Sequence, residues 1–299
     1  MKKIIFYYER NWAFGSIHYG LMKELYKHGI YANLIDWDQE YSYEEFQLLN
    51  DNYDLFVSCP FNVLKLHRQY GIPLNKIVAI AHGQWDILLA KQKADFDFYP
   101  HIHSFYVISE ILKEKCKEWG FQLLPKVVET GIHFDNFYQP ASRQLKTIGY
   151  CGSKESTSFW GHEIKRGYLV DQVANEINIP LIAHKKYNFA CMPALYIQMD
   201  MVVMSSIEEA GGLPMMEAAA AGRLPIGTPV GYFEKNAPLG GGILLPIEEQ
   251  DFKNKLKEYI LFFQKDSTAF YKKCKEAQDY ARENYDWSKK IKPWIEIFI

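Results

Sequence analysis

Residues 206–222 read SIEEAGGLPMMEAAAAG, and this stretch decides the expected fold of the 299-residue chain. Glu209 and Glu217 are separated by seven residues, and the glycine pair Gly211-Gly212 follows the first acid. Leu213-Pro214 then opens an alanine-rich segment that carries the second acid. Proline is preorganised for a first helical turn, whose free N–H groups bind anions, and glycine lets a ligand approach the backbone. The stretch therefore predicts a phosphate-binding helix start flanked by two carboxylates, which suits a nucleotide sugar.

The length and composition indicate a well-packed protein with two domains. A chain of 299 residues is long enough for two domains of roughly 140 residues each. Its hydrophobic content of 48% and aromatic content of 16% support filled cores. A net charge of −2 gives no indication of a nucleic-acid partner. The five scattered cysteines lack a Cys-x-x-Cys motif, which favours reduced thiols in the cytoplasm over disulfides or a zinc site.

Membrane-spanning and export segments are not expected. The N-terminal apolar run is too short for a signal-peptide core and reads as a first strand. Nowhere does an apolar run approach the ~20 residues that cross a bilayer. We therefore expect a soluble protein, with peripheral membrane contact left open.

Short apolar runs alternate with helical stretches along the chain, which is typical of parallel α/β layers. We expect strands at 4–8, 32–35, 55–58, 77–81, 105–108, 181–184, 201–204 and 224–227, with another from residue 147. We expect helices at 16–28, 110–120, 166–178, 214–221 and 288–298, and helical structure over 248–284. The polar run 141–146 is the expected linker.

The pattern Ser-x-x-Glu-x-x-Gly-Leu-Pro-x-x-Glu-Ala-x-Ala-x-Gly over 206–222 closely resembles the donor-site signature of retaining GT-B glycosyltransferases of the family-four type, the glycosyl transferases of group one. An ordinary loop before a buried alanine-rich helix is the alternative, but it does not account for Glu209 or the paired glycines. The resemblance implies an α/β protein of two Rossmann-like domains facing a cleft. Residues 1–143, with a crossing helix at 286–299, would form the acceptor-side domain, and 144–285 the nucleotide-sugar donor domain.

The sequence departs from the family pattern at several places. Residues 126–140 resemble the family's exit from its first domain, but Thr130 and His133 stand where the family has Asn and Asp. Ser153 replaces the family's Arg after a glycine, and Tyr232 replaces the second glycine of a pair. These departures leave a degenerate protein that only binds nucleotide sugars as an alternative, alongside a GT-B sugar-nucleotide epimerase.

The resemblance assigns roles to the residues of the donor domain. Glu209 would contact the sugar near its anomeric centre, and Glu217 would accept hydrogen bonds from the ribose hydroxyls. The backbone of Gly211, Gly212 and Leu213 would meet the phosphate or the sugar. Basic residues would neutralise the diphosphate; the candidates are Lys165, Arg166 and Lys154. The alternative for these three is an ordinary set of solvated charges at a helix start. Base recognition would rely on the backbone of 185–193.

In the first domain, the loop after the first strand holds Gly15 and Ser16, which would let the backbone approach the diphosphate; a tight βα turn is the alternative. His82 follows a strand and resembles the family's strand-end histidine that reaches the transferred sugar. A residue at the carboxyl end of a strand faces the crevice where α/β proteins bind ligands. His18 could face it as well. His101 and His103 lack a nearby third ligand, so no metal site is expected there.

Together these features predict a retaining, metal-independent transferase without a cofactor. It would move a hexose-type sugar from a nucleotide-diphosphate donor to a hydroxyl of a glycan, glycolipid or other acceptor, by front-face substitution in which the leaving phosphate oxygen helps deprotonate the acceptor. Asp36-Trp37-Asp38 and Asp95-Phe96-Asp97 match the Asp-x-Asp of metal-dependent GT-A transferases. That fold would not carry the signature at 206–222, so we interpret both as loop or helix-edge acids.

Overall fold

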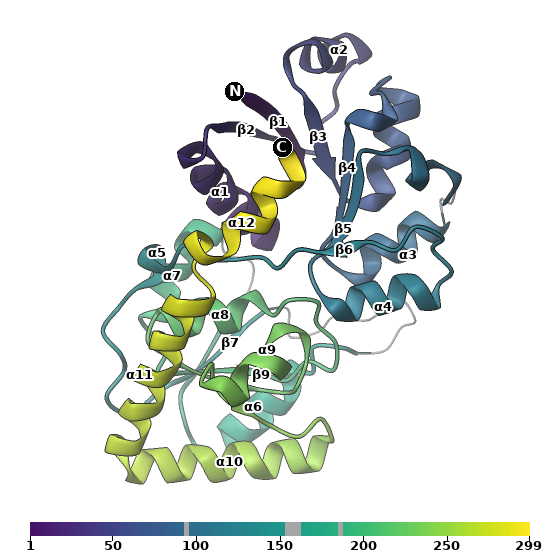
Figure 1. Ribbon diagram of the computed structural model, residues 1–299. Helices are drawn as coiled ribbons and strands as arrows, with labels where there is room; N and C mark the ends of the chain where they lie inside the picture. The colour runs from purple at the N-terminus through teal and green to yellow at the C-terminus, as the bar shows by residue number, and fades with distance from the viewer. Residues whose placement is uncertain (93–95, 153–162, 185–187) are drawn as a thin grey trace. The chain divides into compact units, whose positions relative to one another are not determined.

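A computed structural model describes residues 1–92, 96–152, 163–184 and 188–299 (Figure 1). The chain divides into two compact units: unit 1 contains Met1–Gly131 and Trp287–Ile299, and unit 2 contains Ile132–Asp286. The sequence predicted domain borders between residues 143 and 144 and between residues 285 and 286. The first border lies earlier because the segment from Ile132 is bound to unit 2. The Ile132 N–H donates to the Tyr285 carbonyl at 2.8 Å, and the Ser142 N–H donates to the Gly222 carbonyl at 2.9 Å.

Unit 1 contains a six-stranded parallel sheet in the order β2-β1-β3-β4-β5-β6. The strands are β1 Lys2–Tyr7, β2 Ile30–Ile35, β3 Leu55–Ser58, β4 Ile77–Ala81, β5 Ser104–Val107 and β6 Lys126–Val127. Ile4, Ile5 and Phe6 of β1 are completely buried, as expected for a parallel strand covered on both faces. The first five strands occur where the apolar runs predicted them.

The helices of unit 1 are α1 Trp12–Lys27, α2 Tyr43–Asn52, α3 Gln84–Gln92, α4 Glu110–Glu118 and α12 Trp287–Phe298. α12 lies beside α1 (Figure 1). The indole N–H of Trp294 in α12 donates to the Glu129 carbonyl at 2.9 Å, and the ring of Phe298 meets that of Phe6 at 6.2 Å between centroids. The terminal helix therefore belongs to the core of unit 1, as the resemblance implied.

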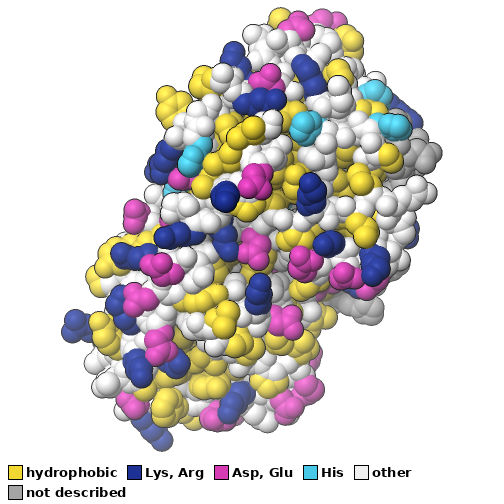
Figure 2. All heavy atoms as spheres, viewed as in Figure 1, with side chains coloured by type: hydrophobic (Ala, Val, Ile, Leu, Met, Phe, Trp, Pro, Cys, Tyr) yellow, Lys and Arg dark blue, Asp and Glu magenta, His cyan; other side chains and the backbone are white. Residues whose placement is uncertain are grey.

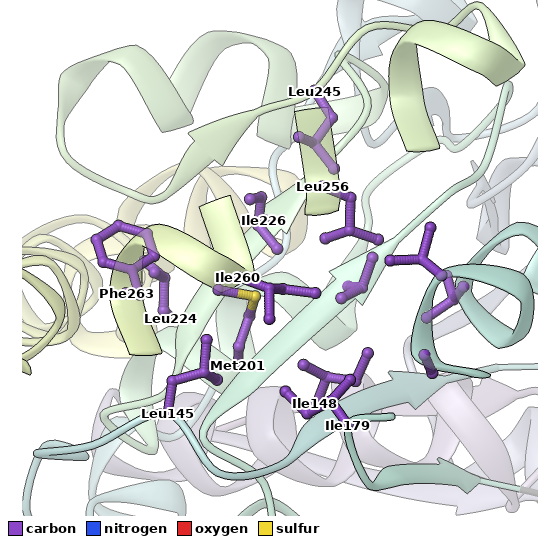
Figure 3. Packing of buried hydrophobic residues seen from close by; sticks show 14 of the residues in the cluster. Leu145, Ile148, Ile179, Met201, Leu224, Ile226, Leu245, Leu256, Ile260 and Phe263 are labelled. Carbon is purple, nitrogen blue, oxygen red and sulfur yellow. The ribbon is translucent and has the colours of Figure 1, made fainter. Parts of the chain in front are cut away.

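Unit 2 contains a five-stranded parallel sheet in the order β11-β10-β9-β7-β8. The strands are β7 Ile148–Cys151, β8 Leu181–His184, β9 Met201–Met204, β10 Leu224–Gly227 and β11 Ile243–Leu244. The helices are α5 Phe134–Phe137, α6 Gly167–Glu176, α7 Met192–Tyr196, α8 Leu213–Ala220, α9 Gly231–Asn236, α10 Glu249–Lys265 and α11 Ser267–Asn284. In Figure 3, Met201 and Leu224 of the sheet meet Ile260 of α10 in the buried core.

In both sheets the strand order changes direction at the first strand of the unit, between β1 and β3 and between β7 and β9. Open α/β sheets bind ligands at such a switch point, outside the carboxyl ends of the strands. The residues after β7 and β9, and those after β1, β3 and β4, are therefore the places to look for a site.

Two features of the described residues bear on nucleic-acid and membrane binding. Basic and acidic side chains are interspersed over the face seen in Figure 2. Within the described ranges, no helix combines the length and the apolar character that crossing a membrane requires.

Candidate functional site

The loop after β9 leads directly into α8, at the switch point of the sheet of unit 2. Gly212 precedes the helix with φ +76°, a left-handed conformation that glycine adopts without strain. Pro214 lies in the first turn of α8, as predicted. Pro214 has no N–H, and the Met215 N–H donates to the Gly212 carbonyl at 3.0 Å. The backbone donors that this helix start can present to an anion are therefore the N–H groups of Gly212 and Leu213.

Gly231, which begins α9, packs against the backbone of Gly211. Gly231 has φ +57°, and a Cβ at this residue would lie 3.1 Å from the carbonyl carbon and oxygen of Gly211. The next residue, Tyr232, donates its backbone N–H to the Gly211 carbonyl at 3.2 Å. The departure from the family pattern at Tyr232 therefore leaves this contact intact, because the contact uses the backbone alone.

Glu209 and Lys165 are brought together by the fold, although 44 residues separate them in the chain. The Lys165 ammonium and the Glu209 carboxylate form an ion pair, and the side chains are 25% and 19% exposed. The Ser206 hydroxyl donates to Glu209 Oε1 at 2.8 Å, and the Thr228 hydroxyl donates to the Ser206 carbonyl. A positive and a negative charge thus lie together beside the Gly211-Gly212 loop.

Arg166 occupies a different environment from its neighbour Lys165. It has φ +49° at the start of α6, and it is only 5% exposed. Its Nε–H donates to the Ser205 carbonyl at 2.8 Å, and its Nη1–H donates to the Ile247 carbonyl at 2.6 Å. Burial lowers the pKa of this guanidinium. Arg166 therefore fastens two loops of unit 2, whereas Lys165 reaches Glu209. The third basic candidate, Lys154, lies outside the described residues.

Glu217 lies in α8 and is 2% exposed. Its Oε2 accepts a hydrogen bond of 2.9 Å from the Tyr196 hydroxyl. Tyr196 ends α7 and is completely buried, and this burial raises the pKa of its hydroxyl well above the ordinary value. The Cys151 thiol, at the end of β7, also contacts Tyr196, and burial raises its pKa to about 12. The network Cys151–Tyr196–Glu217 holds one candidate carboxylate in place at the switch point.

Tyr196 and Cys151 were missed by the sequence analysis. Cys151 could have been found from its place after a predicted strand at the switch point. Tyr196 carries no such signal, because α7 was not predicted. Of the segment expected to recognise the base, residues 185–187 lie outside the described ranges, and the Asn188 side chain accepts a hydrogen bond from the Ala190 N–H.

In unit 1, His82 follows β4 as predicted and is 9% exposed. The backbone N–H groups of His82 and Gly83 donate to Oδ2 of Asp86 at 2.6 and 3.0 Å. Burial lowers the pKa of the His82 imidazole to about 3 and raises the pKa of the Asp86 carboxyl to about 6. His82 is therefore a neutral imidazole at neutral pH, held at the carboxyl edge of the sheet.

Gly15 and Ser16 lie inside α1, which corrects the prediction of a loop at these positions. α1 begins at Trp12, and the Gly15 N–H already donates to the Asn11 carbonyl at 3.3 Å. In this first turn the Phe14 ring lies 5.4 Å from that of Tyr8, which follows β1.

One of the two Asp-x-Asp motifs lies within the described residues. The Asp38 N–H donates to Asp36 Oδ1 at 3.1 Å, so this acid caps a turn after β2. The second Asp-x-Asp begins at Asp95, outside the described residues. Among the residues that the structure describes, no group of three or more His, Cys, Asp or Glu side chains is arranged to hold a metal ion.

Neither a protein-family profile nor a curated protein sequence matches the chain. The fold, in contrast, is similar over the whole chain to solved structures. HepE of Anabaena in complex with UDP and glucose has a TM-score of 0.69 and 15% identity, covering 99% of both chains. Sucrose-phosphate synthase of Thermosynechococcus elongatus has a TM-score of 0.68 and 12% identity, covering 100% of this chain and 98% of that one.

A third similar structure is the catalytic domain of starch synthase IV of Arabidopsis thaliana bound to ADP and acarbose. Its TM-score is 0.69 and its identity 12%, covering 100% of this chain and 98% of that one. These proteins have the GT-B fold of glycosyltransferases, and the likeness shows that this chain has it too. The predicted fold is confirmed.

Proposed function

We propose that this protein transfers a hexose-type sugar from a nucleotide-diphosphate donor to a hydroxyl acceptor, with retention of the anomeric configuration. The observation that carries the proposal is the arrangement around α8. A glycine-rich helix start, an ammonium–carboxylate pair at Lys165 and Glu209, and the buried Glu217 meet at the switch point of one sheet. The GT-B fold, shared with structures of glycosyltransferases that contain nucleotides, supports the same reaction.

Each part of this arrangement fits one part of a nucleotide sugar. The diphosphate would accept hydrogen bonds from the N–H groups at the start of α8. Lys165, which is paired with Glu209, would neutralise the charge that develops on the leaving phosphate. Glu217 would accept hydrogen bonds from the ribose hydroxyls, with Tyr196 fixing one of its oxygens.

We propose that Glu209 contacts the transferred sugar. Glu209 is only partly exposed and held by Ser206, so its charge acts from a fixed position on a sugar that becomes positive as the glycosidic bond lengthens. The neutral imidazole of His82 suits a hydroxyl, because it can donate or accept a hydrogen bond without repelling a developing positive charge. We propose front-face substitution, with the leaving phosphate oxygen helping to deprotonate the acceptor.

We propose that the reaction needs no divalent metal and no cofactor, since a lysine and a helix start can carry the diphosphate charge. We place it in the cytoplasm, because all five cysteines are free thiols.

The test is turnover of UDP-, GDP-, ADP- and CMP-sugars, screened first by the rise in melting temperature that ligand binding produces. We expect one nucleotide class to stabilise the protein. The glycoside formed from its sugar should have the same anomeric configuration, α or β, as the sugar had in the donor. EDTA is expected to leave the rate nearly unchanged. Release of free nucleotide together with an epimerised sugar would indicate a sugar-nucleotide epimerase instead. Binding of a nucleotide sugar without turnover would indicate a protein that only binds it. Absence of both binding and turnover would refute the proposal.

A further inference from the structure

The backbone of Lys165 is held on both sides by side chains from three segments of unit 2. Its N–H donates to Oε1 of Glu163 at 2.8 Å. Its carbonyl accepts two hydrogen bonds, from the Tyr150 hydroxyl at 3.1 Å and from the Ser205 hydroxyl at 2.7 Å. Tyr150 lies in β7 and Ser205 directly follows β9, and both residues are buried. Lys165 is therefore fixed to the two strands between which the strand order changes direction.

The next residue, Arg166, continues this turn in a strained backbone conformation. Its φ of +49° and ψ of 35° are left-handed, which is unfavourable for a residue with a Cβ. The Arg166 N–H donates to Glu163 Oε1 at 3.0 Å, and the Arg166 carbonyl lies 3.0 Å from the Ser205 hydroxyl. Strained residues persist where surrounding contacts over-determine them, and they are concentrated at active sites and ligand clamps. Glu163 and Ser205 therefore stabilise a turn that its own residues do not favour.

Two adjacent serines hold the two partners of the ion pair. Ser205 binds the backbone of Lys165, and the Ser206 hydroxyl donates to Glu209 Oε1 at 2.8 Å. The Lys165 side chain has many rotamers, so its ammonium acts from a defined position only if its backbone is fixed. Misplacement of a binding group by about 1 Å can cost ~100-fold in rate. The hydrogen bonds to the Lys165 carbonyl therefore bear on where the positive charge lies.

We propose that Tyr150 and Ser205 are positioning residues of the transferase, and that they act through Lys165. Their hydroxyls fix the Lys165 carbonyl, and thereby the place from which its ammonium reaches Glu209 and the donor diphosphate. Burial raises the pKa of the Tyr150 hydroxyl above its ordinary value, so this group stays protonated and able to donate at neutral pH. The inference rests on the proposed function, because it assigns two further residues to the same reaction.

The first experiment is a pair of double-mutant cycles. Tyr150→Phe and Ser205→Ala, which remove only a hydroxyl, are made in the natural protein and in the Lys165→Met variant. Initial rates then give kcat/KM for the donor. Tyr99→Phe and Ser58→Ala are the matched controls in both backgrounds. Tyr99 and Ser58 are buried in unit 1, and their hydroxyls donate to backbone carbonyls at 3.1 and 2.7 Å.

The second experiment measures the position of Lys165 without turnover. The amine is 25% exposed and paired with Glu209, so it is accessible to a reagent but engaged by a carboxylate. Acetylation by N-hydroxysuccinimide acetate is followed at each lysine by mass spectrometry of peptides. We expect the rate at Lys165 to rise at least about 3-fold in Tyr150→Phe and in Ser205→Ala, because an ammonium released from its ion pair loses a hydrogen bond to a charged group. The two control variants should leave this rate unchanged.

In the cycles, we expect Tyr150→Phe and Ser205→Ala each to lower kcat/KM about 3- to 10-fold in the natural protein. In the Lys165→Met background their effect should be within about 1.5-fold, since residues that act through a shared partner are not additive. The control substitutions should have the same effect in both backgrounds.

An equal loss of kcat/KM in both backgrounds, no loss in the natural protein, or an unchanged acetylation rate at Lys165 would overturn the proposal. Failure of the proposed function is a separate result, since it appears as absence of donor binding and turnover in the natural protein. The acetylation rates would then still decide whether the two hydroxyls position Lys165.

Discussion

Replacing Gly231 by alanine is expected to damage the donor site, although residue 231 has no side chain that could touch a ligand. Its φ of +57° is a left-handed conformation, which costs a non-glycine residue about 1–2 kcal/mol. The added Cβ would lie 3.1 Å from two backbone atoms of Gly211, whereas carbon atoms pack best at about 3.5–4.0 Å. Gly211 must then move by a few tenths of an ångström, and with it the loop before α8.

The expected effect of Gly231→Ala has two parts. The free energy of unfolding should fall by about 1–3 kcal/mol, the usual range for strain of this kind. The specificity constant kcat/KM for the donor should fall about 10-fold, because displacement of binding groups by 1 Å can cost ~100-fold. Urea unfolding followed by circular dichroism measures the first part, and initial rates over a range of donor concentrations measure the second.

Gly29→Ala provides the control for Gly231→Ala. Gly29 follows α1 in unit 1 with φ +75°, and a Cβ there would meet no atom within 4 Å. The Gly29→Ala variant should lose about 1–2 kcal/mol of unfolding free energy through backbone strain alone. Its kinetics with the donor should not change. Unchanged donor kinetics in Gly231→Ala, with a stability loss equal to that of Gly29→Ala, would refute the idea that Gly231 holds the Gly211 loop.

Three further substitutions test the charged groups. Glu209→Gln should lower kcat on the order of 10²-fold, about 2.7 kcal/mol, with nucleotide affinity nearly unchanged; normal turnover with the true substrates would make Glu209 structural. Lys165→Met should raise the donor KM about 10-fold or more by removing a charged hydrogen bond to the diphosphate, and an unchanged KM in steady-state kinetics would contradict this. His18→Leu tests a pH effect. Burial lowers the pKa of both His18 and His82 in the folded state, so the stability that these neutral imidazoles contribute is present above pH 6.5 and is lost as the pH falls below it, in the case of His82 down to its folded pKa of about 3. The pKa of the Asp86 carboxyl is raised from 3.8 to about 6 in the folded state, so protonation of this carboxyl stabilises the fold as the pH falls from 6 to 3.8. This gain offsets the loss of stability that one histidine causes. The melting temperature should therefore fall between pH 7 and pH 5, and fall less in His18→Leu; an equal fall in both proteins would argue against the prediction.

The sheets of both units were predictable because buried parallel strands leave short apolar runs in the sequence. β3, β4, β8, β9 and β10 begin and end at the predicted residues. α2 was missed although a signal was present. Ser42 and Glu45 form a reciprocal capping box, in which each side chain accepts from the other residue's N–H. The short helices α5, α7 and α9 depend on contacts within unit 2 and leave little periodicity to detect.

The candidate site was only partly readable from the sequence. The signature at 206–222 placed Glu209, Glu217 and the glycine pair at one helix start, and the structure has them there. The sequence could not separate Lys165 from Arg166, because adjacent side chains at a helix start point in different directions that the local backbone decides. Arg166 has a left-handed φ, and its guanidinium donates to the Ser205 and Ile247 carbonyls. Lys165 instead forms an ion pair with Glu209. Tyr196 could be found only from the fold, since 21 residues separate it from its partner Glu217.

The place of α12 in unit 1 has a consequence for how the protein is made. Trp294 and Phe298 complete a core whose other members, Phe6 among them, lie at the beginning of the chain. During synthesis, the ribosome must produce all of unit 2 before these side chains emerge. Unit 2 is continuous in sequence and can fold as soon as it is complete, whereas unit 1 waits with an apolar gap beside α1. The first part of the chain to be synthesised is therefore the last to be finished.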